Sequence, residues 1–222
     1  MSSRGVLICG LLVLLIAWAG PLPSLVPASF AAHMMLHMSV VGIGVPLVAI
    51  GLAPLVADRL PRSQLMLPIA VSLVDFVVVW GWHAPALHDA ARSNPAVLAV
   101  EQASFAIVSL LVWVLALAGT EQTRTQAALS GALTLFFTSM HMTLLGALLG
   151  LAPRTMFDHS HHGLAGLPPL ADQQLGGVIM LAIGGVIYLA GGLTLVARPA
   201  HGQPMPSFMH GDHHQKHPRH VP

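Results

Sequence analysis

Long apolar stretches alternate along this chain with short connections rich in proline or polar residues. Six stretches approach the roughly 20 residues that a helix needs to cross a bilayer. They cover Gly5–Gly20, Phe30–Leu52, Leu65–Trp82, Pro95–Gly119, Ala127–Leu151 and Gln174–Ala197. Because lipid offers no partner to backbone polar groups, each stretch must be helical. The pattern therefore predicts an all-α, polytopic membrane bundle of about six transmembrane helices.

Composition supports this class and excludes others. Apolar residues make up 55% of the 222 residues and charged residues only 8%, against about 25% charged residues in ordinary soluble domains. The net charge is +1, and no basic face points to nucleic acid as a partner. The single cysteine, Cys9, excludes an internal disulfide and a cysteine-only metal site. The chain is expected to contact membrane lipids along most of its length.

The connections between the stretches are expected to be loops. They cover Pro21–Pro27, Asp58–Gln64, His83–Asn94, Thr120–Gln126 and Ala152–Gln173. Within the second stretch, Pro46 and Pro54 are expected to bend or end the helix, because proline removes a backbone hydrogen bond.

We divide the chain into three parts: 1–29, 30–197 and 198–222. The first holds an uncleaved transmembrane helix and outer loop, or else a signal peptide cut after Ser29-Phe30-Ala31. We favour the helix, because the region between its apolar core and that cut is long for a signal peptide. The second part is a five-helix membrane core. The third is a histidine-rich, disordered cytoplasmic tail, for which we favour a solvated segment over one that captures metal.

Lysine and arginine counts set the orientation, because cytoplasmic connections carry an excess of both. If the N-terminus is cytoplasmic, only Arg92 and Arg154 face outward. The cytoplasmic side then holds Arg4, Arg59, Arg62, Arg124, Arg198, Lys216 and Arg219. This bias predicts that both termini are cytoplasmic.

The same topology sorts the fourteen histidines, although they were not used to choose it. Six lie in the tail and eight in the outer half: His33, His37, His83, His88, His141, His159, His161 and His162. Histidine is expensive inside a membrane, so buried examples are functional candidates. His88, His159, His161 and His162 are expected to be loop residues, none of them essential.

The strongest candidate chemistry lies at the start of the second stretch. His33 and His37 are four residues apart and so share a helical face, and Met34 and Met38 form a second such pair. Imidazole with thioether is a ligand set suited to copper, and the thioether favours Cu(I). These four residues, with His83 and His141, form the predicted metal site.

Two carboxylates are expected to support that site. Asp75, Val79 and His83 form an i, i+4, i+8 row, which places Asp75 about 12 Å deeper than His83 on one helical face. Glu101 lies about 9 Å inside the fourth stretch. An unpaired charge there costs several kcal/mol, so both carboxylates should pair with histidine N–H groups or balance a cation. No catalytic residue is predicted.

Small residues recur on the last two stretches. Gly177, Gly184 and Gly191 are spaced by seven residues, and Gly146 and Gly150 form a small-xxx-small pair. Such stripes allow helices to approach closely, so we interpret them as architecture without chemistry.

Five short segments, read in order, resemble a known family. They are His33–Met38, Trp82–Leu87, Met140–Leu149, Ala152–Arg154 and Asp172–Gly177. Over about 30–197 the chain is similar to the multi-span CtaG family of cytochrome c oxidase assembly factors. The resemblance implies a bacterial inner-membrane chaperone, not an enzyme. Its implied role is to bind copper transiently at the periplasmic face and deliver it to the oxidase. The implied partners are oxidase subunits, core subunit I above all, and a periplasmic copper carrier.

The chain departs from the family pattern at two places. The family's fourth helix begins H-x-x-x-H-x-x-F, whereas Leu98 and Gln102 stand in the histidine positions ahead of Phe105 here. The family's tryptophan after the Gly-Gly of the sixth helix is replaced, because this chain continues Val-Ile-Met-Leu. These departures shift the expected site towards the second, third and fifth helices.

Three other functions fit the same residues. A haem held by His37, His83 or His141 would make the chain an electron-transfer protein. Asp75, Glu101 and His141 could instead carry a cation or proton, although the sequence shows no inverted repeat. A purely structural scaffold for the oxidase is the fourth reading.

Overall fold

The computed structural model describes residues 2–57, 66–117, 124–157 and 163–200, without the side chains of 66, 124–126 and 198–200. In chain order it contains α1 (Ser3–Ala19), α2 (Leu22–Leu25), α3 (Phe30–His37), the π-helix η1 (Met38–Gly44), α4 (Val45–Val56), α5 (Met66–Trp82), α6 (Pro85–Ser93), α7 (Pro95–Leu117), α8 (Arg124–Gly150), the 3-10 helix η4 (Leu164–Gly166) and α9 (Pro169–Ala200). The predictions for His159, His161, His162 and the tail lie outside the described residues.

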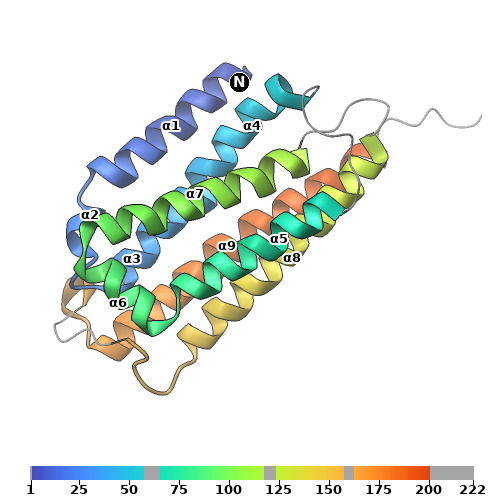
Figure 1. Ribbon diagram of the computed structural model, residues 1–222. Coiled ribbons are helices and arrows are strands. Elements are labelled where there is room, and N and C mark those ends of the chain that lie inside the picture. The colour runs from blue at the N-terminus through green and yellow to red at the C-terminus, as the bar shows by residue number, and fades with distance from the viewer. Residues whose placement is uncertain (1, 58–65, 118–123, 158–162, 201–222) are drawn as a thin grey trace, which may run out of the picture.

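The helices form one elongated bundle, as the sequence predicts (Figure 1). Five are long and apolar enough to cross a membrane: Ser3–Leu25, Phe30–Val56, Pro95–Leu117, Ala127–Gly150 and Pro169–Ala197. The helices α5 and α6 meet the same criterion only when taken together, and they meet at a bend of 71°, so they add a sixth span if the bent pair is one broken span. The described residues contain no strand. The fold is therefore a polytopic helical bundle of five or six spans.

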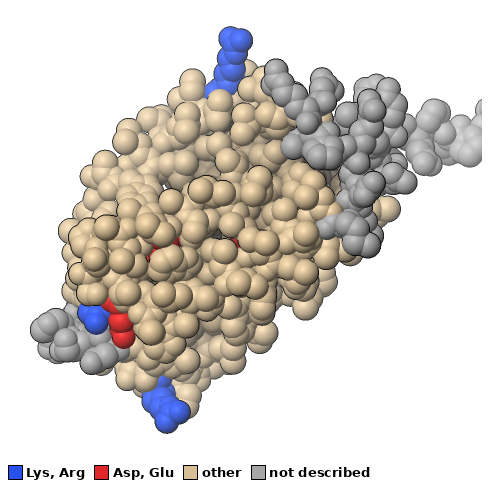
Figure 2. Space-filling view, in the orientation of Figure 1, with Lys and Arg blue, Asp and Glu red and all other residues tan. Residues whose placement is uncertain are grey.

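The outside of the bundle is apolar. Large side chains such as Ile16, Val77 and Val186 are more than half exposed, which suits contact with lipid rather than water. On the face shown in Figure 2, the Lys and Arg side chains of the described residues lie towards the ends of the molecule. Many polar residues of the spans are buried instead, among them Asp75, Glu101 and His141.

The second span runs unbroken from Phe30 to Val56, longer than expected, because a π-helical segment accommodates Pro46. In η1 the Val45 N–H donates to the Val40 carbonyl, five residues back. The next donor in that pattern would be Pro46, which has no N–H. The carbonyl of Val41 is satisfied instead by the Tyr188 hydroxyl of α9, at 3.4 Å. Pro54 lies two residues before the end of α4.

Three connections are more ordered than expected. The first, Pro21–Pro27, contains α2, and the first span extends to Leu25. The segment His83–Asn94 is not a loop, because α6 occupies most of it. Pro85 takes the first helical position, where its missing N–H removes no bond and its fixed φ suits a helix. The last helix begins at Pro169, five residues before the predicted start.

The glycine stripes bring α8 and α9 into close contact, as the sequence predicts. A Cβ on Gly177 would lie 2.7 Å from the Gly146 carbonyl oxygen and in still closer contact with the Gly150 backbone. Only hydrogen fits between the two backbones there. This contact fixes α9 against α8 and so places Gly184, one heptad further along, beside the interior side chains of η1 and α8.

A buried carboxylate fastens the start of α3 to α9. Asp172 Oδ2 accepts from the backbone N–H groups of Phe30 and Ala31, at 2.6 and 3.3 Å. Its Oδ1 accepts from Ser29 Oγ at 2.8 Å and from the Leu164 N–H at 2.9 Å. Backbone donors at a helix N-terminus stabilise a carboxylate in this way. Asp172 therefore sets the position of the helix that carries His33 and His37.

Replacing Gly177 with alanine should destabilise the bundle by about 1–3 kcal/mol, the usual cost of overpacking, because backbone on both sides cannot move aside. Thermal unfolding in detergent would measure this loss. Gly81→Ala is the matched control, because a Cβ there meets nothing within 4 Å. Equal unfolding temperatures for the two variants would contradict the close contact.

Asp172→Asn should destabilise the protein by about 1.5–3 kcal/mol, since the amide keeps only one of the two accepting oxygens. Asp89→Asn serves as the control, because Asp89 is partly exposed and pairs with Arg92 at 3.7 Å. Such surface ion pairs contribute at most about 1 kcal/mol to the free energy of unfolding. Chemical unfolding of both variants tests the difference. A cost for Asp172→Asn no larger than the control's would show that the fastening is unimportant.

Candidate metal centre

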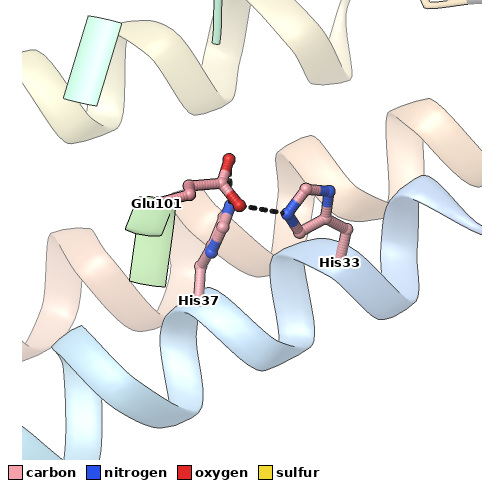
Figure 3. Close-up of side chains that lie close together, drawn as sticks. All are labelled: His33, His37 and Glu101. Atoms are coloured by element: carbon pink, nitrogen blue, oxygen red, sulfur yellow. Dashed lines mark hydrogen bonds and ion pairs between the residues drawn. The ribbon is translucent and has the colours of Figure 1, made fainter. Parts of the chain in front are cut away.

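Three buried side chains from two helices meet inside the bundle. His33 and His37 project from one face of α3, and Glu101 projects from α7 (Figure 3). All three are at most 2% exposed. One potential ligand atom from each lies within 4.8 Å of the others, an arrangement that could hold a metal ion. We call these three residues the triad.

The carboxylate of Glu101 contacts both imidazoles. Its Oε2 lies 2.8 Å from His33 Nε2, and its Oε1 lies 3.7 Å from His37 Nε2. The two rings are themselves close, with centroids 4.3 Å apart. Nitrogen atoms from successive helical turns therefore face one carboxylate from the neighbouring helix (Figure 3). Glu101, assigned from the sequence to charge balance, is positioned as a potential ligand itself.

Gln102 controls which nitrogen of His37 carries the proton. Its Nε2 lies 2.5 Å from His37 Nδ1 and donates to it. Its Oε1 has no hydrogen-bond partner among the described residues. A half-turn of the amide would make Oε1 the acceptor of an Nδ1–H, which would leave the Nε2 lone pair directed towards Glu101. The triad can thus present His37 either as a donor or as a ligand.

Aromatic rings enclose the triad at the end of the bundle formed by α2 and α6. His88 packs on His33 with ring centroids 4.7 Å apart, and Phe157 packs on His88 at 4.3 Å. Phe105 meets His37 edge-on at 4.7 Å. The prediction that His88 is a loop residue is wrong: it lies on α6 and is fully buried. The signal for this helix was Pro85 followed by good helix formers.

His83 has one nitrogen engaged and the other available. Its Nδ1 donates to the Val79 carbonyl at 2.7 Å, which leaves the lone pair on Nε2. That Nε2 is buried and has no hydrogen-bond partner among the described residues. The ring lies 5.8 Å from that of His37, centroid to centroid. A backbone acceptor that fixes the tautomer is the usual setting of a metal-binding histidine.

A narrow cavity continues from the triad into the bundle. Its free space is about 10 Å³, enough for about one water molecule. It is lined by His37, Met38, Val41, Asp75, Val79, His83, Phe105, Met142, Met180 and Tyr188. The row Asp75, Val79 and His83 faces this one cavity, as the helical spacing predicts.

His141 lies apart from the other predicted ligands. Its Nε2 donates to Asp75 Oδ2 at 3.1 Å, and Thr138 Oγ1 lies 3.4 Å from the same oxygen. His141 is therefore paired with a carboxylate of α5 and does not line the cavity. Of the two predicted methionines, Met38 lines the cavity, whereas Met34 packs where a Cβ on Gly176 of α9 would lie.

Four residues at the site were not singled out as site residues from the sequence: His88, Gln102, Met142 and Met180. Gln102 was noted only as a departure from the family pattern, yet it contacts His37 directly. Met142 could have been found, because it follows His141 in the motif. Met180 carries no local signal, since only the packing of α9 turns it inward.

Comparison with known proteins agrees with this architecture. A family model described as cytochrome c oxidase caa3 assembly factor (Caa3_CtaG) matches residues 5–201. Searches of curated proteins and of solved structures found no match. The match includes the triad and the cavity, and it covers the membrane spans described above apart from the first two residues of α1. The chain belongs to the Caa3_CtaG family of cytochrome c oxidase assembly factors.

Proposed function

We propose that this protein binds copper as Cu(I) at the triad and delivers it to the core of cytochrome c oxidase during assembly. It acts as a metal chaperone rather than an enzyme. The single observation that carries the proposal is the meeting of His33, His37 and Glu101, all buried, with potential ligand atoms within 4.8 Å of one another.

Charge favours a monovalent ion. A charged group near the middle of a membrane costs about 2.5–3.5 kcal/mol or more unless it is balanced. Glu101 supplies one negative charge to the triad, and the two imidazoles supply none when neutral. Cu⁺ would therefore give a neutral site, whereas a divalent ion would leave one uncompensated positive charge in an apolar interior.

The hydrogen bond between His33 and Glu101 suggests how the ion enters and leaves. A proton held between Nε2 and Oε2, 2.8 Å apart, occupies the position that a metal would take. Binding would exchange this proton for Cu⁺, because metal ligands must be deprotonated. Release to a partner would return the proton. Such a site can give up its cargo more readily than a closed thiolate cage.

The site is expected on the extracytoplasmic side of the bacterial inner membrane. The triad lies towards the end of the bundle that carries α2 and α6, where the described cations are Arg92 and Arg154. Arg4 lies at the opposite end, at the start of α1 (Figure 1). The larger share of basic residues in the sequence falls on that opposite side, which supports its assignment to the cytoplasm.

Cavity size argues against the haem alternative. The space beside His37 and His83 holds about one water molecule. A porphyrin would require the helices to separate widely, whereas a single ion would require only small side-chain movements.

His33→Ala/His37→Ala should lose bound copper after anaerobic purification, with affinity for Cu(I) lowered by more than the 10–100-fold typical of supporting residues. Metal analysis of wild type and variant measures this, and the tail histidines contribute equally to both. An unchanged helical spectrum and elution profile would show that the fold is intact. Met34→Leu should retain copper, because that side chain packs on α9. Equal copper in the wild type and the double variant would refute the triad site.

Glu101→Gln should impair oxidase assembly in cells that carry it as their only copy, because it removes the charge that balances Cu⁺ while keeping the size. The readout is oxidase activity together with the copper content of the purified oxidase. Met140→Leu, at a lipid-facing position of α8, should be silent. If Glu101→Gln and the double histidine variant both assembled normal oxidase, the protein would act as a scaffold instead.

A further inference from the structure

We propose that the cavity beneath the triad is a second copper site, selective for Cu(I), formed by the thioethers of Met38, Met142 and Met180 with the imidazole of His83. The proposal rests on the proposed copper-handling function and extends it: the triad receives the ion, and the methionine cavity selects it. We call this second set of residues the methionine site.

The three methionines come from three separate elements and line the same cavity. Met38 belongs to η1, Met142 to α8 and Met180 to α9, and each is at most 2% exposed. Gly184 provides room for two of them: the Met38 sulfur and the Met142 terminal methyl lie 3.7 and 3.5 Å from where its Cβ would be. Soft thioether ligands select Cu(I) over the divalent metals that imidazole and carboxylate also accept.

His83 distinguishes this cavity from ordinary packing. Methionine often does no more than fill a core, and three methionines alone would not indicate a ligand. The Nε2 of His83, however, carries a lone pair in a cavity that offers it no hydrogen-bond donor among the described residues. A buried polar atom without a partner is costly and calls for an explanation. A metal ion bound at Nε2 would provide it.

Asp75 supplies the charge that the site requires. Its carboxylate lines the cavity and accepts a hydrogen bond from His141 Nε2 at 3.1 Å. Three thioethers and a neutral imidazole bring no charge, so a bound Cu⁺ would be balanced by this one carboxylate. The arrangement repeats that of the triad, in which Glu101 is the one negative group.

His37 joins the two sites. It belongs to the triad and also lines the cavity, with its ring 5.8 Å from that of His83. An ion released from Glu101 could therefore pass to the methionines without leaving the side chains that bind it. The ligands change from nitrogen and oxygen to nitrogen and sulfur along this path. Zn²⁺ could occupy the triad but would be poorly held at the second step.

The test is copper X-ray absorption on the purified full-length protein loaded anaerobically with Cu(I), combined with titration against a Cu(I) chelator. All samples carry Met205→Leu and Met209→Leu, so that the tail contributes no sulfur. The reference should show sulfur as well as nitrogen around copper. Met142→Leu/Met180→Leu, which conserves volume, should lose most of the sulfur scattering and bind Cu(I) at least about tenfold more weakly.

Met140→Leu is the matched control, because it neighbours Met142 on α8 but is 54% exposed. It should leave the sulfur signal and the affinity unchanged, and Zn²⁺ binding should be the same in all three proteins. A reference protein with copper but no sulfur scattering, or one whose sulfur signal survives in the double variant, would overturn the methionine site while leaving the triad intact. A reference protein that binds no copper would overturn both. A ratio of bound copper to protein that is unchanged in His33→Ala/His37→Ala would refute the triad alone.

Discussion

The cost of placing a carboxylate in hydrocarbon is the constraint on which the interior of this bundle depends. Glu101, Asp75 and Asp172 are all buried in the described part of the chain, and each contacts polar groups of another helix. An unpartnered charge at these positions would cost several kcal/mol, comparable to a large part of the stability of a protein. The helices are therefore arranged so that each carboxylate meets its donors.

The donors differ in kind, and so do the roles of the three carboxylates. Asp172 is satisfied by backbone N–H groups and a serine hydroxyl, which cannot be exchanged, and it acts as a fastening between α9 and α3. Glu101 and Asp75 each lie within hydrogen-bond distance of an imidazole nitrogen instead. An imidazole can release its proton and offer a lone pair to a metal instead. The fixed contact of Asp172 thus positions α3, the helix that carries His33, whose contact with Glu101 can exchange its proton for a metal ion.

The two residues of α7 that depart from the family's histidine pattern, Leu98 and Gln102, lie close to Glu101 in the sequence. Gln102 stands at one of the two expected histidine positions, and it contacts His37 from α7. It offers no imidazole, yet its amide can serve either tautomer of His37. Leu98, at the other position, is buried and apolar. The triad therefore takes its third potential ligand atom from Glu101, beside those positions.

The sequence by itself determined the class of fold, the approximate spans and the histidine pair, because hydrophobic length and helical spacing are local properties. Spacing also placed Asp75, Val79 and His83 on one face. It could not assign partners across helices: Glu101 to His33, Asp75 to His141, or Met180 to the cavity. Those pairings depend on the rotation and depth of each helix, which are decided by the contact between Gly177 and α8, by the π-helical turn ahead of Pro46 and by the fastening at Asp172. Side chains distant in sequence meet only after these contacts have set the register.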